Sequence, residues 1–169
     1  MKVLIVAGGT GGHISPGVSI YRELKKRGVS LLFVTDSRGL KFPIISNFVN
    51  SEEVKVIPIS GGFSKNIFRN FRVFYEFLVS FFVSFRLILS FNPDRIILTG
   101  GYVSGPVGVA SIVLRKKIIL LEQNSVMGIT NRILSLFASK VILTFPLKDR
   151  KKYPKNFERI GNPIRYGSE

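Results

Sequence analysis

Val3-Leu4-Ile5-Val6-Ala7 runs directly into Gly8-Gly9-Thr10-Gly11-Gly12-His13, and this junction decides the fold. A short, β-branched apolar run that ends in glycines predicts a buried parallel strand. Ser15 and Pro16 follow, a cap-type residue and a proline that favour the first turn of a helix. The predicted order is strand, glycine loop and helix N-terminus, where free backbone N–H groups and the helix dipole favour a phosphate or another oxyanion.

The spacing of these glycines differs from that of two common nucleotide-binding loops. The pattern G-x-x-x-x-G-K-[ST] does not occur in the chain, so a Walker-type NTPase is unsupported. The pattern G-x-G-x-x-G fails because Ile14 stands where its third glycine belongs. Asp36, after the second predicted strand, therefore gives only weak support to a nucleotide-dependent oxidoreductase. A tight turn that binds nothing is a further alternative.

His13 is the only histidine of the chain and directly follows the last glycine of the loop. A lone histidine often has a purely structural role. An imidazole beside an oxyanion site, however, is placed to act as a general base or to donate a hydrogen bond to a phosphate. We predict that His13 is the catalytic residue.

Length and composition bound the class of protein. The 169 residues predict one domain with a proper hydrophobic core. The chain has no cysteine, which excludes disulfides and thiolate metal sites and fits a reducing cytoplasm. One histidine and 10 scattered carboxylates also predict no metal site. The short apolar run after Lys2 does not match a signal peptide.

The formal net charge of +15 restricts the partners. It suits a nucleic acid, an anionic membrane surface or a phosphorylated substrate. Neither zinc-ligand spacing nor an aromatic RNA-binding strand motif accompanies the basic clusters, so we expect no nucleic-acid partner.

Strand-like and helix-like segments alternate along the whole chain, which predicts an α/β fold with a doubly wound parallel sheet and ligands at the carboxyl ends of its strands. The expected strands cover residues 3–7, 31–34, 54–59, 95–98, 117–121, 140–143 and about 157–160, and the expected helices cover 15–27, 38–47, 66–91, 106–114 and 128–137.

The helical stretch 66–91 carries an unusually wide apolar arc. The helical period places Arg69, Arg72, Glu76 and Ser80 on one stripe, opposite an apolar face that holds Phe74, Leu78, Phe81, Phe85 and Leu89 and is widened by Phe71, Tyr75, Phe77 and Phe82. A fully buried core helix is one interpretation. A membrane span is disfavoured by two charges, Glu76 and Arg86, and by the need to return to the same sheet.

The third interpretation is a helix that lies in the membrane interface. Apolar side chains would enter the membrane surface while basic ones meet anionic head groups. The predicted membrane patch comprises Phe74, Leu78, Phe81, Phe82, Phe85, Lys65, Arg69 and Arg72.

Two further loops repeat the glycine-rich or polar ending of the first strand. The fourth strand leads into Thr99–Pro106, which contains Gly100, Gly101 and Gly105, and the fifth leads into Glu122–Ser125. In a parallel sheet, these turns share one edge with the Gly8–His13 loop. Together they predict a cleft for a large, polar, phosphorylated ligand.

With these loops, the chain resembles the peptidoglycan N-acetylglucosaminyltransferase family. The matching motifs are, in family order, Gly8–His13 with Pro16, Gly100–Pro106, Glu122–Ser125 followed by Gly128 and Thr130–Arg132, and Gly161–Arg165. The resemblance implies a Rossmann-like N-terminal domain of a GT-B glycosyltransferase. It further implies an acceptor-binding domain over residues 1–160, the start of an inter-domain hinge over 161–169, and a donor-binding domain that is missing.

The resemblance also implies the reaction, which is the inverting transfer of GlcNAc from UDP-GlcNAc to lipid I, forming lipid II. Lipid I is an undecaprenyl-pyrophosphate-linked MurNAc-pentapeptide. No cofactor or metal is implied, and the expected location is peripheral, on the cytoplasmic face of the inner membrane. The alternative is a non-catalytic membrane-docking module that binds the acceptor and needs a separate donor-binding chain.

Site residues follow from the same resemblance. His13 is implied as the base or phosphate partner, and Thr10, Gly11, Gly12, Asn124 and Arg165 as residues that reach the donor. The acceptor pyrophosphate site is implied at the glycine loops, and the substrate-binding set includes Gly100, Gly101, Tyr102, Ser104 and Glu122. One departure is Leu121, which stands where the family usually has a histidine.

Overall fold

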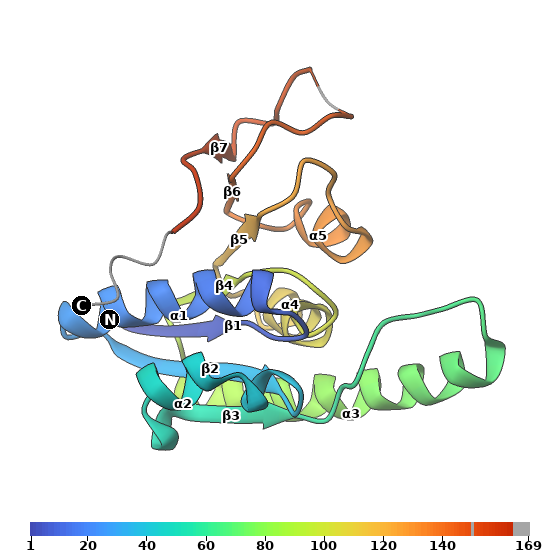
Figure 1. The fold of residues 1–169 in the computed structure, drawn as a ribbon, viewed down its shortest axis with the longest axis horizontal. Helices are drawn as coiled ribbons and strands as arrows, with labels where there is room; N and C mark the ends of the chain where they lie inside the picture. The colour runs from blue at the N-terminus through green and yellow to red at the C-terminus, as the bar shows by residue number, and fades with distance from the viewer. Residues whose placement is uncertain (150, 164–169) are drawn as a thin grey trace.

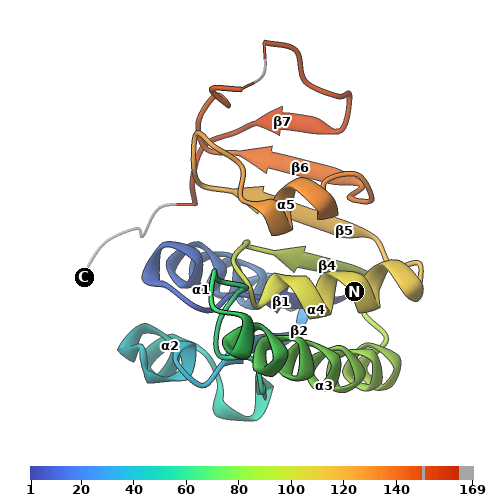
Figure 2. The same cartoon turned by 90° about the vertical axis from the view of Figure 1, so that its right-hand side faces the viewer.

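A parallel β-sheet forms the centre of the protein, with helices on both of its faces (Figures 1 and 2). The computed structural model describes residues 1–149 and 151–163, and within them the sheet has seven strands in the order β3-β2-β1-β4-β5-β6-β7. The strands are β1 (Lys2–Val6), β2 (Ser30–Asp36), β3 (Val54–Ile57), β4 (Arg95–Leu98), β5 (Ile118–Glu122), β6 (Lys140–Leu143) and β7 (Phe157–Arg159). The predicted doubly wound α/β fold is therefore confirmed.

The helices divide into two groups, one for each face of the sheet. They are α1 (Gly11–Lys26), α2 (Pro43–Phe48), α3 (Ile67–Phe91), α4 (Ser104–Val113) and α5 (Ile129–Leu134), with short 3₁₀ turns η1 (Gly39–Lys41) and η2 (Ser51–Glu53). Helices α1 and α2 pack on one face through Val3, Ile5 and Phe33. Helices α3, α4 and α5 cover the other face, where Leu4 and Val6 point. Because β1 is buried on both faces, its sequence is continuously apolar.

The register of the central strands brings the predicted loops to one edge. Val6 pairs with Leu98 and Leu98 with Leu120, so β1, β4 and β5 end side by side. The loops that follow them start at Ala7, Thr99 and Gln123. The expectation that three turns share one rim is confirmed.

Helix α1 begins earlier than predicted. Its first residue is Gly11, so Gly11, Gly12 and His13 form its first turn and Pro16 lies inside the helix. The prediction that Ser15 and Pro16 open the helix is wrong. Pro16 has no N–H to donate to the carbonyl of Gly12, but the preceding glycines turn tightly enough to start the helix directly after the strand. His13 is therefore held by helical backbone rather than by a loop.

Helix α3 packs on α4 through small residues, which corrects the predicted orientation. Ser80 and Ser84 are buried together with Val73 and Ile88, whereas the sequence pattern placed Ser80 on the stripe of Arg69, Arg72 and Glu76, opposite the apolar face. Small side chains allow two helices to approach closely, and this packing overrides the polarity of serine. The Ser84 hydroxyl donates to the Ser80 carbonyl at 2.6 Å, which satisfies it inside the contact.

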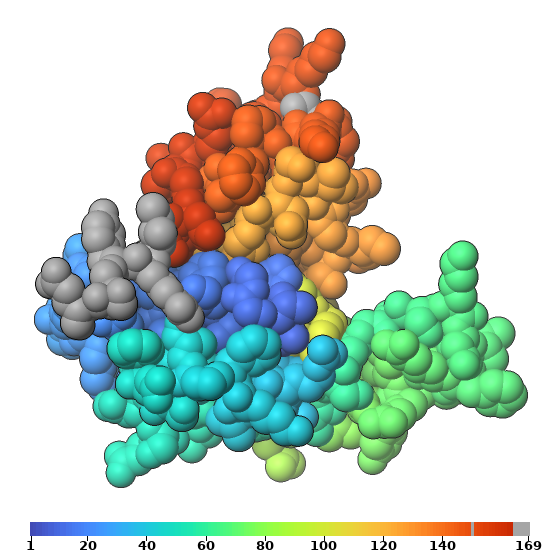
Figure 3. Space-filling view, in the orientation of Figure 1, coloured from blue at the N-terminus to red at the C-terminus, as the bar shows by residue number. Residues whose placement is uncertain are grey.

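The first half of α3 and the preceding loop project beyond the sheet as an arm (Figures 1 and 3). We call residues 63–82 the aromatic arm. Its exposed apolar side chains are Phe63, Ile67, Phe68, Phe71, Phe74, Tyr75, Leu78 and Phe82. Phe81 and Phe85, which we predicted to be part of the membrane patch, are instead half-buried against the core.

The exposure of the aromatic arm also excludes the interpretation of α3 as a fully buried core helix, since Phe68 is 84% exposed. By length and composition alone, α3 is the one helix of the described residues that reaches the requirements of a membrane span. Its neighbours in sequence, β3 and β4, belong to the same sheet, and the second half of α3 covers that sheet.

Candidate functional site

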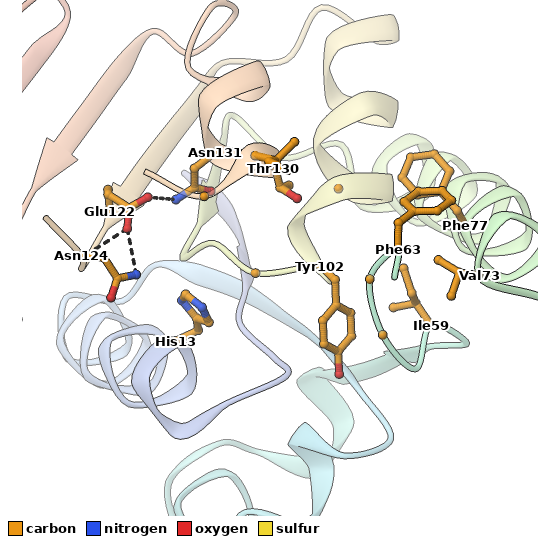
Figure 4. Close-up of a pocket in the computed structure, with 16 residues that line it drawn as sticks. His13, Ile59, Phe63, Val73, Phe77, Tyr102, Glu122, Asn124, Thr130 and Asn131 are labelled. Carbon is orange, nitrogen blue, oxygen red and sulfur yellow. Dashed lines mark hydrogen bonds between the residues drawn. The ribbon is translucent and has the colours of Figure 1, made fainter. Parts of the chain in front are cut away.

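A cavity of about 370 Å³ lies at the carboxyl edge of the sheet, and the aromatic arm forms part of its lining (Figure 4). Its two ends differ in chemistry. The polar end carries His13, Glu122, Asn124 and Asn131, and the apolar end carries Ile59, Phe63, Val73 and Phe77, with Tyr102 between them. The remaining lining comes from Gly61, Gly62, Gly101, Gly105, Gly128, Ile129 and Thr130. This division suits a ligand with a polar head and an apolar extension.

The imidazole of His13 is held in one orientation at the polar end. Its Nδ1 lies 2.9 Å from the carbonyl oxygen of Thr99 and 3.1 Å from Oε1 of Gln123. A carbonyl oxygen can only accept, so Nδ1 carries the hydrogen and donates it. In the neutral ring, the lone pair then lies on Nε2, which accepts no hydrogen bond from the described residues. The arrangement prepares Nε2 to accept a proton from a ligand.

Gly100 and Gly101 allow the imidazole ring to lie directly against the backbone. Their φ angles are +98° and +75°, in the region that side-chain-bearing residues rarely adopt. A Cβ on Gly101 would lie 3.1 Å from Cδ2 of His13, and one on Gly100 would lie 3.2 Å from Cε1. The Gly100–Gly101 backbone therefore forms the surface on which the side chain of His13, the predicted catalytic residue, packs.

Asp36 joins the same two loops from beneath the site. Its side chain is fully buried, and its Oδ1 accepts hydrogen bonds from the backbone N–H groups of Gly9 at 3.0 Å and Gly39 at 2.9 Å. Its Oδ2 accepts the hydroxyl of Tyr102 at 2.6 Å. Burial and, next, the hydrogen bond to Asp36 raise the pKa of Tyr102 to about 12. Tyr102 is therefore a neutral phenol that is fixed at the middle of the cavity.

Glu122 organises the amide side chains of the polar end. It is 1% exposed. Its Oε1 accepts the backbone and side-chain N–H groups of Asn124 at 2.9 and 3.1 Å, and its Oε2 accepts Nδ2 of Asn131 at 2.8 Å (Figure 4). Both carboxylate oxygens are thus used within the protein. Glu122 positions two asparagines rather than offering a free carboxylate to a ligand.

The predicted substrate-binding residues divide into three groups. Gly101, Tyr102, Glu122 and Asn124 line the cavity with His13, and Gly100 is buried behind the imidazole. Thr10 and Gly12 are exposed and Gly11 half-exposed at the start of α1, outside the cavity wall. The first helical residues, Gly11 and Gly12, have no partner within the helix for their N–H groups, which leaves these groups available to an anion.

Ser104 and Arg165 are the remaining predicted substrate-binding residues. Ser104 is fully buried, and its hydroxyl is used by the backbone of Gly100, from whose N–H it accepts at 3.1 Å and to whose carbonyl it donates at 2.9 Å. We predicted Ser104 to bind the substrate, but its hydroxyl instead holds the backbone of the loop at Gly100. Arg165 lies outside the described residues.

The structure adds residues that the sequence did not identify as members of the site. Asn131 was visible only as part of a matching motif, and Asp36 only as a weak analogue of a ribose-binding acid. The Gly61–Phe63 loop gave no signal, because it follows β3 with no recognisable spacing. No group of three or more His, Cys, Asp or Glu residues in the described ranges is arranged to hold a metal ion.

The parallel sheet and the glycine-seated cavity at its carboxyl edge define a Rossmann-like domain of the GT-B glycosyltransferase class. Residues 3–143 match the glycosyltransferase family 28 N-terminal domain, and the chain belongs to that family.

Proteins similar to this chain span about twice its length. A relative from Natranaerobius thermophilus is 39% identical over 168 residues, which cover 96% of this chain and 45% of the relative. Another from Finegoldia magna is 38% identical over 170 residues, 98% of this chain and 45% of the relative. Both are named UDP-N-acetylglucosamine–N-acetylmuramyl-(pentapeptide) pyrophosphoryl-undecaprenol N-acetylglucosamine transferase.

A solved structure agrees with these relatives. The crystal structure of Acinetobacter baumannii MurG is similar to this chain with a TM-score of 0.79 and 25% sequence identity. The similarity covers 98% of this chain and 46% of that one. In each comparison, this chain therefore spans less than half of the longer protein.

Proposed function

We propose that the chain is the acceptor-binding half of a transferase that moves GlcNAc from UDP-GlcNAc to the undecaprenyl-pyrophosphoryl MurNAc-pentapeptide. The substrates are those in the names of the two relatives. The observation that carries the proposal is the fixed imidazole of His13 at the wall of a cavity built from three loops. Its Nδ1 is bound to the Thr99 carbonyl, and its Nε2 accepts no hydrogen bond from residues 1–149 and 151–163.

In this proposal, His13 is the general base. An inverting transfer requires the acceptor hydroxyl to lose its proton as the new glycosidic bond forms and UDP leaves. Nε2 accepts that proton, and the resulting imidazolium is stabilised by the carbonyl oxygen of Thr99 and the side-chain oxygen of Gln123, which both face Nδ1. The oxygen atoms thus favour the charged ring at the moment when it forms.

The acceptor pyrophosphate binds, in this proposal, between the two glycine loops. The N–H groups of Gly11 and Gly12 lie at the N-terminus of the 16-residue helix α1, whose dipole favours an anion. Asn124 and Tyr102 supply further polar groups next to these loops. In the complete enzyme, we propose that the donor sugar nucleotide is also contacted from this half, by Thr10, Gly11, Gly12, Asn124 and Arg165.

The aromatic arm supports peripheral attachment to a membrane, with the cavity facing the membrane surface. Phe71 is 73% exposed, Phe74 54% and Phe82 61%. Lys65, Arg69 and Arg72 are exposed on the same segment. A wide exposed apolar surface next to basic side chains fits insertion into the interface of an anionic membrane. The net charge of +15 adds a long-range attraction to the same surface.

The donor-binding half is a proposed partner, either as a further domain or as a separate chain. An apolar groove of about 370 Å³ supports this partner, because it lies on the sheet face that α1 and α2 leave open. Ile119, Leu121 and Ile142 of β5 and β6 line the groove together with Gly161–Pro163, where the described chain ends.

The alternative function is a non-catalytic docking module that binds acceptor and membrane. The exposed aromatic arm favours it independently of His13. A His13→Ala variant separates the two functions in a complete, reconstituted enzyme. Loss of GlcNAc transfer with retained liposome binding supports catalysis by this half, whereas unchanged transfer supports the docking module.

Incubation of the chain with UDP-GlcNAc and a lipid I analogue tests the proposal. We expect product only when the remaining part of a relative is supplied as a second polypeptide. Rapid product formation by the chain alone would refute the need for a donor-binding half. Failure of the chain to bind the lipid I analogue would refute acceptor binding.

A further inference from the structure

Glu76 is the only acidic residue of α3, and it lies inside the aromatic arm. Its side chain is 14% exposed although its neighbours in sequence, Tyr75 and Phe74, point into solvent. A largely buried carboxylate is unfavourable unless it accepts hydrogen bonds or pairs with a positive charge. The proposed reaction uses no group on this helix, so the partners of Glu76 indicate a separate role.

These partners tie Glu76 to the loop that precedes α3. Oε2 of Glu76 accepts the backbone N–H of Ser60 at 2.9 Å and its hydroxyl at 2.7 Å, while Oε1 accepts Nε of Arg72 at 2.7 Å. Burial alone would raise the pKa of Glu76, but the hydrogen bonds from Ser60 and Arg72 outweigh it and lower the pKa. The carboxylate is therefore ionised near neutral pH, and its bonds to Ser60 are charge-assisted.

Ser60 is the first residue of a segment that forms one wall of the cavity. Gly61, Gly62 and Phe63 follow it and all line the cavity. Two consecutive glycines give this wall wide conformational freedom unless its ends are fixed. At the far end, Ser64 exchanges two hydrogen bonds with the Asn70 side chain, at 2.8 and 2.9 Å. Glu76 holds the other end.

We propose that Glu76 is a positioning residue that clamps the Ser60–Phe63 wall to α3 and thereby forms the apolar end of the cavity. This inference rests on the proposed function, in which the cavity receives a lipid-linked pyrophosphate. The clamp does not touch the polar end, where His13 and Asn124 lie (Figure 4). It therefore selects a pyrophosphate that carries a prenyl chain over free pyrophosphate.

The test compares Glu76→Ala and Glu76→Gln with the unchanged chain. Amide hydrogen exchange of the segment 58–66 reports the clamp directly, because the Ser60 N–H is one of its bonds. Calorimetry with farnesyl pyrophosphate and with inorganic pyrophosphate reports its effect on binding. We expect faster exchange and about tenfold weaker farnesyl pyrophosphate binding for Glu76→Ala, as for loss of a charge-assisted hydrogen bond. Glu76→Gln keeps one acceptor oxygen and restores part of both.

Arg86→Ala is the matched control, since Arg86 is exposed on the same helix outside the aromatic arm. We expect it to leave exchange of the wall and both affinities unchanged, and all variants to retain the thermal midpoint and the affinity for inorganic pyrophosphate. Exchange at the wild-type rate in Glu76→Ala, or a farnesyl pyrophosphate affinity within about twofold of wild type, overturns the clamp. If the unchanged chain binds neither ligand, the proposed function fails together with the selectivity, and hydrogen exchange still decides whether Glu76 holds the wall.

Discussion

Tyr102 Oη donates a 2.6 Å hydrogen bond to Asp36 Oδ2 across 66 residues of sequence. The same carboxylate accepts the backbone N–H groups of Gly9 and Gly39. One buried aspartate therefore fixes the first glycine loop and the tyrosine of the second relative to each other. The position of Tyr102 in the cavity wall depends on this bond.

The raised pKa of Tyr102 predicts a loss of stability in alkali. Its ordinary value is 10.0, whereas in the folded protein burial and the Asp36 hydrogen bond raise the pKa to about 12. Between these values, the unfolded phenol loses its proton and the folded one keeps it, so the free energy of unfolding decreases as the pH rises. Urea unfolding on both sides of pH 10 measures this decrease. We expect a smaller decrease in Tyr102→Phe, and equal decreases in the two proteins would contradict the assignment.

Asp36→Asn is expected to destabilise the protein by about 2–4 kcal/mol, because an amide cannot accept all three hydrogen bonds and leaves a buried donor without a partner. The pKa of Tyr102 should fall toward its ordinary value while remaining raised, since burial is the larger cause. Denaturant unfolding and ultraviolet titration of the phenol measure the two effects. Asp149→Asn, at an exposed acid, is the control. A stability loss of similar size in both variants would count against the special role of Asp36.

His13→Gln is expected to lower GlcNAc transfer about 10²–10⁴-fold in the enzyme assembled with its donor-binding half, because the general base is lost. Glutamine retains a side-chain N–H for the Thr99 carbonyl, so acceptor affinity should change little. Product formation and calorimetric binding of the lipid I analogue give the two quantities. A parallel loss of transfer and of acceptor affinity would instead make His13 a binding residue.

Gly101→Ala is expected to lose about 1–2 kcal/mol of stability, because its φ of +75° is unfavourable for alanine. Its Cβ would also displace the His13 ring, which lies 3.1 Å away. Gly28→Ala is a matched control, with a φ of +72° and no atom within 4 Å of its Cβ. Thermal unfolding should show similar losses in both. Only Gly101→Ala should also lower GlcNAc transfer in the enzyme assembled with its donor-binding half, because only there is the His13 ring displaced. Equal transfer by the two variants would show that the position of the imidazole does not depend on Gly101.

Replacing Phe71 and Phe74 by serine is expected to weaken binding to anionic liposomes by tenfold or more, since each exposed ring contributes about 1–2 kcal/mol when it enters the interface. Co-sedimentation with the liposomes measures the loss of binding. Its dependence on salt concentration measures the electrostatic contribution of Lys65, Arg69 and Arg72. Leu136→Ser is the control, at a leucine that is 77% exposed outside the arm. Equal liposome binding by all variants would exclude the aromatic arm as the membrane surface.

The two predicted faces of α3 show why part of the site was out of reach of sequence reasoning. A helical period locates stripes, but it does not say which stripe meets a neighbouring helix. Ser80 and Ser84 are buried because α4 approaches closely there, whereas Phe71 and Phe74 remain exposed because the arm extends past the sheet. The predicted membrane patch therefore includes Phe81 and Phe85, which the structure places half-buried against the core, while Phe74, Leu78 and Phe82 of the same prediction are exposed.

The sequence by itself determined the parallel sheet, the order of its elements and the edge at which three loops meet, because apolar runs, glycines and strand direction are local properties that fix these features. Only the tertiary structure decided that Asp36 joins Gly9 to Tyr102, that Gly100 and Gly101 seat the ring of His13, and that Glu76 holds the cavity wall. These contacts join residues from different elements, and their distances depend on how closely the helices pack on the sheet and on one another.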